Sequence, residues 1–139
     1  MFKVKRKSDG TIARYLARLV ARGFTQEHGI DYTETFAPTV KFSTIRVILV
    51  FTAYHDWEVE QLDVVTAFLS TELKEKVYMR QPEGFRECGD YGNELVCELH
   101  RAIYGLKQSP RYWYQTITAW LLDFGFFQSV VDHCVYVYV

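Results

Sequence analysis

Two segments of the chain repeat their hydrophobic residues at the spacing of an α-helix. In residues 44–55 the apolar side chains recur every three or four positions after a candidate N-cap at Ser43. The second segment starts at Ser109 and Pro110, which suit an N-cap and a first helical position, and stops at Gly125. The pattern therefore predicts two helices, the first of them buried.

Shorter segments show the alternation, or the enrichment in β-branched and aromatic residues, that is typical of strands. They lie at residues 11–24 (a hairpin, or one strand and a loop), 57–64, 77–79, 95–99 and 134–139. Residues 66–73 suggest a short helix, and residues 25–42, which lack periodicity, a surface loop. This order predicts an α+β fold in which helices pack on one face of a mostly antiparallel sheet.

Composition narrows the class of protein. With 139 residues, 49% of them hydrophobic and 17% aromatic, the chain is one domain or part of one and is not a disordered protein. It has no apolar run of about 18 residues and no secretory signal, so we expect no membrane span. The three cysteines (Cys88, Cys97 and Cys134) and the four histidines lack zinc-site or redox spacing, which favours a reducing intracellular setting.

The net charge of −1 conceals an uneven distribution. Residues 1–22 carry seven basic groups and one acid, whereas residues 56–98 carry eleven acids and four bases. The basic end is either a solvated surface or one that faces phosphates, since Arg14, Arg18 and Arg22 can bind phosphate oxygens. Charge alone favours the solvated surface.

One carboxylate, Asp63, ends an apolar extended segment just before the chain turns. An aspartate in this position is suited to bind a hard cation such as Mg²⁺. The alternative is a cap for the helix that starts near Thr66. Phe68 follows closely, and its ring either packs in the core or faces a bound sugar. Nucleotidyl transfer uses a pair of Mg²⁺ ions, and one carboxylate cannot place both.

A second candidate site is the loop from Tyr104 to Arg111, directly before the predicted second helix. Gly105 would let the backbone approach a substrate closely. The helix N-terminus, together with Lys107 and Arg111, would favour an anion. The alternative is an ordinary strand-to-helix turn with a solvated lysine.

Together these segments resemble the reverse transcriptase of copia-type LTR retrotransposons. Five stretches carry the resemblance, in order: Ala17–Gln26, Gly29–Pro38, Gln61–Leu69, Val77–Phe85, and Tyr104–Arg111 with Trp113. The resemblance covers the chain from about residue 9 to residue 139. It implies a fingers-like basic segment over about residues 1–42 and a partial polymerase palm, with intervening fingers elements, over about residues 43–139.

The resemblance also implies roles for individual residues. Asp63 would be the first catalytic aspartate, with the backbone carbonyl of Val64 beside it on Mg²⁺. Phe68 would occupy the position that excludes ribonucleotides. The remaining candidates would contact the incoming nucleotide (Tyr104, Gly105 and Lys107) or the triphosphate or template (Arg18 and Arg22).

The chain departs from the family pattern at several positions. Leu16 and Val65 replace usual lysines, and Ser70-Thr71 replaces an Asn-Gly turn. The Tyr-Val-Asp-Asp turn of the family is missing, because the similar run Tyr136–Val139 carries no carboxylate. Asp132 matches an aspartate upstream of that turn and is not counted as catalytic.

We therefore expect a fragment of such a reverse transcriptase. The complete domain would extend a primer with deoxynucleotides on an RNA or DNA template, using Mg²⁺, in a polyprotein that also holds integrase and RNase H. The chain alone is expected to be inactive because it lacks the other metal-binding carboxylates. The alternatives are a non-catalytic remnant that binds nucleic acid and a non-functional relic of a decayed element.

Overall fold

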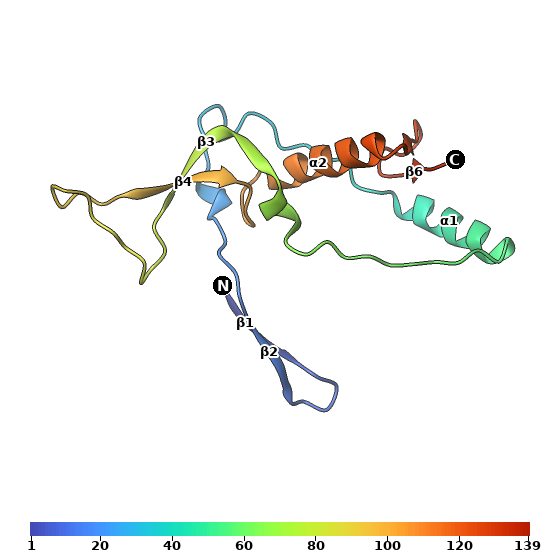
Figure 1. The fold of residues 1–139 in the computed structure, drawn as a ribbon, viewed down its shortest axis with the longest axis horizontal. Helices are drawn as coiled ribbons and strands as arrows, with labels where there is room; N and C mark the ends of the chain where they lie inside the picture. Colours follow the sequence, from blue (N-terminus) through green and yellow to red (C-terminus); the bar gives the residue numbers. More distant parts are fainter.

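The computed structural model describes all of residues 1–139 (Figure 1). In chain order its elements are β1 (Phe2–Arg6), β2 (Ile12–Ala17), η1 (Gly23–Thr25), α1 (Phe42–Tyr54), η2 (Ala67–Ser70), β3 (Glu72–Arg80), β4 (Val96–Arg101), α2 (Ser109–Asp123), β5 (Phe127–Gln128) and β6 (Tyr136–Val137), where η denotes a 3₁₀ turn. The strands form three antiparallel pairs, β1–β2, β3–β4 and β5–β6, which do not join into one sheet. The α+β class is confirmed, whereas the single sheet is not formed.

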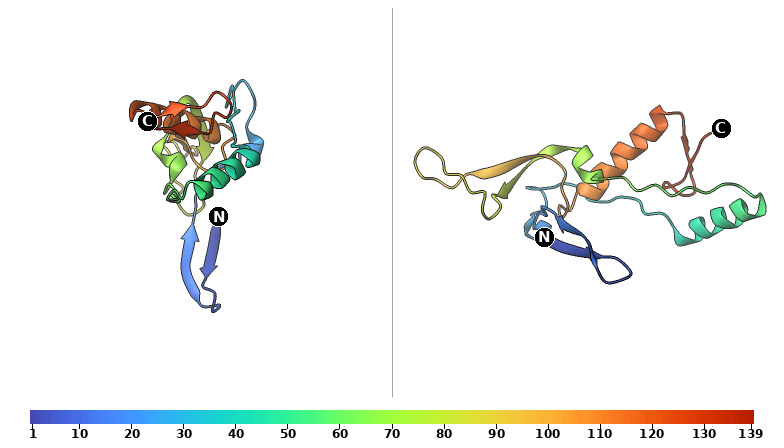
Figure 2. Two further views of the ribbon diagram at one scale, coloured as in Figure 1. Left: turned by 90° about the vertical axis from the view of Figure 1, so that its right-hand side faces the viewer. Right: turned by 60° about the horizontal axis from the view of Figure 1, so that its bottom comes forward.

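The molecule is elongated, and its elements extend from a small centre (Figures 1 and 2). In Figure 1 the β1–β2 hairpin projects downward, the loop between β3 and β4 extends to the left, and α1 lies at the right. Only 12 of the 139 residues are buried, so the centre is small. Its hydrophobic cluster consists of Ala21, Val77, Ile103 and Leu106. The core therefore forms where β3 meets the segments that follow β2 and precede α2.

The β1–β2 hairpin is stabilised locally at its turn. The Asp9 carboxylate accepts hydrogen bonds from the hydroxyl of Thr11 (2.6 Å) and from its backbone N–H (2.8 Å). Both bonds lower the pKa of Asp9, the hydroxyl bond most strongly. Residues 11–24 form one strand, β2, followed by a loop, which is the second of the two alternatives predicted for them. The hairpin partner of β2 is β1, which lies before the predicted range.

The predicted burial of the first helix is wrong. Helix α1 begins at Phe42, just before the position predicted from Ser43, and Thr52 is its only buried residue. Val50 and Phe51 are more than half exposed. Helical spacing shows which residues share a face, but burial also requires a partner element, and no helix or strand packs closely along α1.

Asp132 holds the N-terminus of α1. One carboxylate oxygen, Oδ2, accepts hydrogen bonds from the backbone N–H of Lys41 (3.1 Å) and the hydroxyl of Thr44 (2.8 Å). The other, Oδ1, accepts one from the backbone N–H of Cys134 (3.0 Å). These bonds, that from Cys134 above all, lower the pKa of Asp132. Asp132 therefore has a structural role in this chain.

The strand predicted at residues 57–64 is not formed. These residues pair with no other strand and run as a long stretch between α1 and η2 (Figure 1). An alternating pattern is necessary for a half-buried strand, but the strand exists only through hydrogen bonds to a neighbour, and none lies beside this segment. The short helix predicted at 66–73 is reduced to η2, and β3 begins at Glu72, earlier than predicted.

Helix α2 lies where its sequence predicts. Its first residue is Ser109, so Gln108 rather than Ser109 occupies the N-cap position, and Pro110 lies in the first turn. The Ser109 hydroxyl donates to the carbonyl of Ile103 (2.7 Å) and thereby ties the helix to the segment before it. Gly125 follows the helix with φ of +105°, a conformation that glycine adopts without strain.

The two remaining strand predictions are confirmed in position but not in length. Strand β4 overlaps residues 95–99 and extends two residues further. Strand β6 occupies only part of residues 134–139, and it pairs with the equally short β5. None of the helices has the length and apolar character needed to cross a membrane.

Candidate active site

Three segments that are distant in the sequence meet at Tyr104. The backbone N–H of Ala21, in the loop after β2, donates to the carbonyl of Tyr104 (2.8 Å). Val20 and Tyr104 also form an isolated parallel bridge. On its side-chain face, Tyr104 contacts Phe68 of η2. The loop after β2, the η2 turn and the segment before α2 are therefore joined at this residue.

Two glycines allow the backbones to approach this closely. A Cβ placed on Gly105 would lie 2.1 Å from the carbonyl oxygen of Ala21, and one on Gly23 would lie 1.9 Å from the carbonyl oxygen of Gly105. Gly105 also has φ of +94°, outside the range that residues with a side chain readily adopt. Gly105 is thus required for backbone packing in this chain, whatever it contacts in a complex.

Three of the predicted site residues form a row of side chains. The Arg18 guanidinium lies 5.1 Å from the centre of the Tyr104 ring, within cation–π range. The Tyr104 and Phe68 rings meet edge to face, with centroids 4.8 Å apart and an interplanar angle of 68°. The structure therefore brings together Arg18, Tyr104 and Phe68, which the sequence placed in three different motifs.

Lys107 points into the loop after β2. Its Nζ donates to the carbonyl of Gln26 (3.1 Å) and to the hydroxyl of Tyr32 (3.3 Å), and it lies 4.9 Å from the centre of the Tyr32 ring. Its backbone N–H donates to Oε1 of Gln26 (2.8 Å). In this arrangement Lys107 fastens residues 26–32 to the segment before α2.

Gln108 completes the same attachment and is fully buried. Its Oε1 accepts a hydrogen bond from Nε2 of Gln26 (3.0 Å), and its own Nε2 donates to the carbonyl of Asp31 (2.9 Å). Sequence reasoning missed both glutamines. A single polar residue in a loop carries no periodic signal, so only the fold reveals that Gln26 and Gln108 are partners.

Replacing Gln108 by leucine is expected to loosen residues 26–32. Leucine has a similar volume but leaves the Gln26 amide and the Asp31 carbonyl without partners in half-buried positions, which costs about 1 kcal/mol. Hydrogen exchange of the Lys107 amide and of residues 26–32 measures the effect. Gln61→Leu, at an exposed glutamine, is the matched control. Equal protection in both variants would contradict the assigned role.

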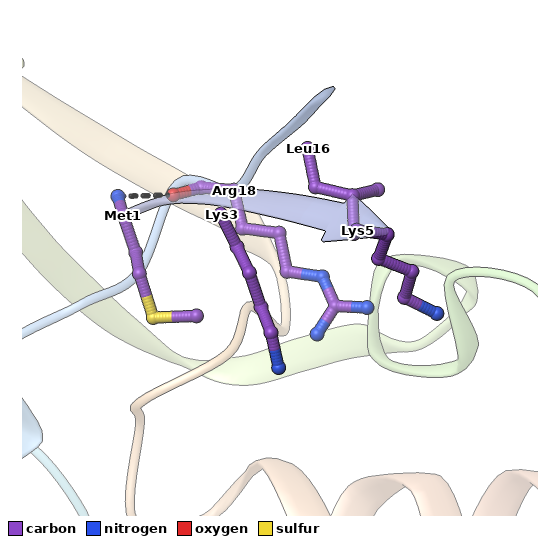
Figure 3. A pocket seen from close by; sticks show the side chains of 5 residues that line it. All are labelled: Met1, Lys3, Lys5, Leu16 and Arg18. Carbon is purple, nitrogen blue, oxygen red and sulfur yellow. Dashed lines mark hydrogen bonds between the residues drawn. The ribbon is translucent and has the colours of Figure 1, made fainter. Parts of the chain in front are cut away.

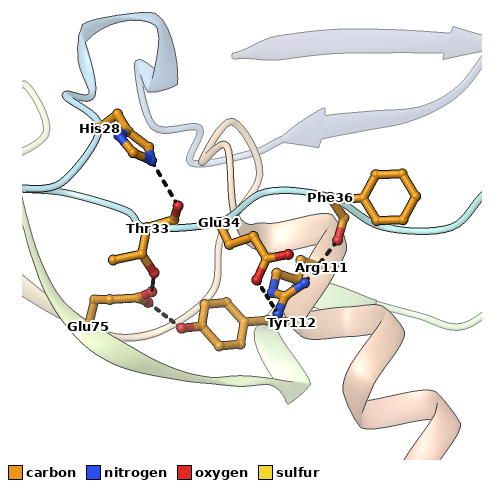
Figure 4. A network of polar contacts seen from close by, with 7 residues as sticks. All are labelled: His28, Thr33, Glu34, Phe36, Glu75, Arg111 and Tyr112. Atoms are coloured by element: carbon orange, nitrogen blue, oxygen red, sulfur yellow. Dashed lines mark hydrogen bonds and ion pairs between the residues drawn. The ribbon is translucent and has the colours of Figure 1, made fainter.

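A second polar network attaches residues 28–36 to β3 and α2 (Figure 4). Arg111 forms an ion pair with Glu34 (2.6 Å) and donates to the carbonyl of Phe36 (3.4 Å). The Tyr112 hydroxyl donates to the carboxylate of Glu75, which also accepts a bond from the hydroxyl of Thr33 (3.4 Å). Arg111, a predicted anion-binding residue, is thus paired within the chain.

Tyr112 should make stability depend on pH in the alkaline range. Burial, followed by the hydrogen bond to Glu75 and the charge of that residue, raises the pKa of Tyr112 from 10.0 to about 12. Because the unfolded chain loses this proton at a lower pH, the hydroxyl contributes fully to the free energy of unfolding below pH 10, and this contribution declines as the pH rises through 12. The midpoint temperature of thermal unfolding should therefore fall more steeply across this range in the parent than in Tyr112→Phe. Identical pH profiles would refute this, and Tyr91→Phe, at an exposed tyrosine, is the control.

Asp63 is exposed and takes part in no side-chain hydrogen bond or ion pair. The alternative that it caps a helix near Thr66 is not realised, because η2 has no side-chain cap. The Asp63 carboxylate and the Val64 carbonyl offer the oxygen ligands that Mg²⁺ prefers, so these residues fit part of such a site. No group of three or more His, Cys, Asp or Glu residues in the structure is arranged to hold a metal ion.

The β1–β2 hairpin carries a basic pocket of about 220 Å³ (Figure 3). Lys3, Lys5 and Arg18 line it together with Met1 and Leu16, and no acidic residue is among them. Met1 also donates through its terminal amine to the carbonyl of Arg18 (2.8 Å), which closes the end of the hairpin. Such a surface suits an anion.

The arginines of the basic end do not form one row. Arg14 lies opposite Lys5 in the hairpin register, and Arg18 reaches Tyr104. Arg22 lies beyond the end of β2, next to η1, where its carbonyl accepts hydrogen bonds from Thr25. The structure therefore separates Arg22 from the hairpin pocket to which Arg18 belongs.

The model for the reverse transcriptase (RNA-dependent DNA polymerase) family matches residues 1–139. The chain therefore belongs to this family. It is 47% identical over 136 residues to the "Retrovirus-related Pol polyprotein from transposon TNT 1-94" of Nicotiana tabacum, covering 98% of the chain and 10% of the relative. It is also 47% identical over 137 residues to the "Retrovirus-related Pol polyprotein from transposon RE1" of Arabidopsis thaliana, covering 99% and 9%.

A more distant relative is the "Transposon Ty1-ER2 Gag-Pol polyprotein" of Saccharomyces cerevisiae, 32% identical over 127 residues, which cover 88% of the chain and 6% of that protein. No solved structure matches the chain. The chain spans about a tenth of the length of the plant relatives. It is thus a fragment of a retrotransposon reverse transcriptase domain of the copia type, as its motifs predict.

Proposed function

We propose that the chain supplies the fingers and part of the palm of a polymerase that extends a primer with deoxynucleotides on an RNA or DNA template. In this assignment residues 1–42 belong to the fingers and residues 43–139 to the palm with intervening fingers elements. The main support for this proposal is the contact of Arg18, Tyr104 and Phe68, which joins the basic hairpin to the turn that follows Asp63. The family match over the whole chain supports it.

Asp63 and the carbonyl of Val64 are the proposed metal ligands. Bound Mg²⁺ would help to ionise the primer hydroxyl and would neutralise charge on the triphosphate. The exposed, unpaired carboxylate of Asp63 is free to serve this purpose. Because the 139 residues bring no group of acidic side chains together, the isolated chain is not expected to polymerise, and the remaining ligands would come from the rest of a complete domain.

The other residues divide between the nucleotide and the nucleic acid. The Phe68 ring would face the sugar and exclude a 2′-hydroxyl by its volume, and Tyr104, Gly105 and Lys107 would line the nucleotide site. Arg18 would contact a triphosphate or template phosphate, a role supported by its place in the basic pocket with Lys3. Arg22 is proposed for the same role at a separate position.

A chimera tests this function. The chain replaces the 136 matching residues of the tobacco polyprotein, and primer extension is measured on an RNA template with and without Mg²⁺. We expect Mg²⁺-dependent extension by the chimera and none by the isolated chain. Should the folded chimera fail while the tobacco parent extends the primer, the function is refuted. Salt-dependent binding of RNA by the isolated chain in that case would support the non-catalytic alternative.

A further inference from the structure

The Phe68 ring belongs to the η2 turn, which lies against α2 and β4. Thr66, the N-cap residue of this turn, has φ of +56°, and its side chain makes no capping hydrogen bond. The turn is anchored after Phe68, where the Arg101 guanidinium donates to the carbonyl of Leu69 (3.1 Å) and the Ala102 N–H donates to the carbonyl of Thr71 (2.9 Å). These bonds hold the end of the turn, but they fix neither its first residues nor the direction of the Phe68 ring.

Tyr104 is the aromatic partner that restricts that ring. The two rings meet edge to face at 4.8 Å, a preferred geometry for an aromatic pair. Phe68 is only half-buried, so the orientation of its ring depends on few side-chain contacts, and the contact with Tyr104 is one of them. Removing the Tyr104 ring would open other side-chain rotamers to Phe68.

Tyr104 is itself held firmly. Its backbone carbonyl accepts the Ala21 N–H, its flanking residues Ile103 and Gly105 pack against the loop after β2, and Arg18 lies over its ring. Its hydroxyl, unlike those of Tyr32, Tyr112, Tyr114 and Tyr136, makes no hydrogen bond within the chain. The ring is thus the part of Tyr104 that acts on Phe68.

We propose that Tyr104 is a positioning residue for sugar selection: by holding the Phe68 ring, it sets how strongly the polymerase prefers deoxynucleotides over ribonucleotides. This inference rests on the proposed function, in which Phe68 faces the sugar. An orientation set by one edge-to-face contact is worth about two- to tenfold in selectivity.

The first experiment measures the contact in the 139-residue chain by hydrogen exchange. In Tyr104→Leu, the Leu69 and Thr71 amides, which donate to Thr66 and Phe68 carbonyls, should exchange about two- to tenfold faster. Tyr104→Phe should restore the parent rate because it keeps the ring. Tyr91→Leu removes an exposed tyrosine and is the matched control. Unchanged exchange in Tyr104→Leu would overturn the proposal without any reference to polymerase activity.

The second experiment measures selectivity in the tobacco chimera as the ratio of kcat/KM for a deoxynucleotide to that for the matching ribonucleotide. This ratio cancels the fraction of folded enzyme, so a purely structural defect does not move it. Tyr104→Leu should lower the ratio about two- to tenfold, Tyr104→Phe should preserve it, and adding Tyr104→Leu to Phe68→Ala should have no further effect.

The outcomes separate the two proposals. If Phe68→Ala lowers the ratio and Tyr104→Leu does not, the role of Tyr104 is refuted while the function stands. If Phe68→Ala leaves the ratio unchanged in an active chimera, the sugar-facing role of Phe68 falls, and the selectivity role of Tyr104 with it. A folded but inactive parent chimera overturns the proposed function instead.

Discussion

Replacing Asp63 by asparagine in the tobacco chimera is expected to lower Mg²⁺-dependent primer extension by about a thousandfold, because a catalytic metal contributes several kcal/mol to stabilisation of the transition state. Asparagine keeps the size of the side chain, but it removes the negative charge and replaces one of the two acceptor oxygens by an NH2 donor. The loss should appear in kcat, since the metal acts on charge that develops during the reaction.

The structure makes this experiment easy to interpret. Asp63 is exposed and takes part in no hydrogen bond or ion pair, so its replacement should leave thermal unfolding unchanged. Asp90→Asn, at an exposed aspartate in the loop between β3 and β4, is the matched control for the change of charge. Extension by Asp63→Asn within about tenfold of the parent would show that Asp63 is not a metal ligand of the reaction.

The elements that the sequence predicted well are those that depend on local interactions. Helix α2 has its own start signal at Pro110 and stop signal at Gly125. Strand β2 begins close to the predicted start at residue 11, directly after a turn that Asp9 stabilises within three residues. Such interactions are complete within a short segment, so the sequence pattern is sufficient to reveal them.

The sequence predictions that failed are those that required a neighbouring helix or strand. Residues 57–64 alternate like a strand and α1 repeats like a buried helix, yet neither has a neighbouring element in the structure. Periodicity identifies the face that would be buried, and it contains no information on what would cover that face. The large exposed side chains of α1 follow directly from this difference.

The candidate site divides in the same way. Sequence motifs identified Tyr104, Gly105 and Phe68 as separate residues of interest, and the structure joins them through backbone and ring contacts. Gln26 and Gln108 were not identified, because their importance arises only when the fold buries one against the other. Chemistry-bearing residues were therefore easier to predict than the residues that position them.

Gly105→Ala is expected to destabilise the centre of the chain strongly, because the added methyl group meets both a steric clash and an unfavourable backbone conformation. The added Cβ would lie 2.1 Å from the backbone oxygen of Ala21, a distance that requires the two segments to move apart. The left-handed conformation at φ of +94° adds a cost of about 1–2 kcal/mol. Together these effects should destabilise the contact by about 3 kcal/mol or more.

Exchange of the Ala21 amide, which donates to the carbonyl of Tyr104, reports on this contact directly. We expect it to exchange more than about a hundredfold faster in Gly105→Ala, the equivalent of the loss in free energy. Gly29→Ala separates the two causes, because Gly29 has φ of +85° but open space where its Cβ would lie, so this variant carries only the conformational cost. If Gly105→Ala destabilised the chain no more than Gly29→Ala does, the conformational cost alone would explain the glycine at position 105. The close approach of residues 21 and 105 would then not be the reason for it.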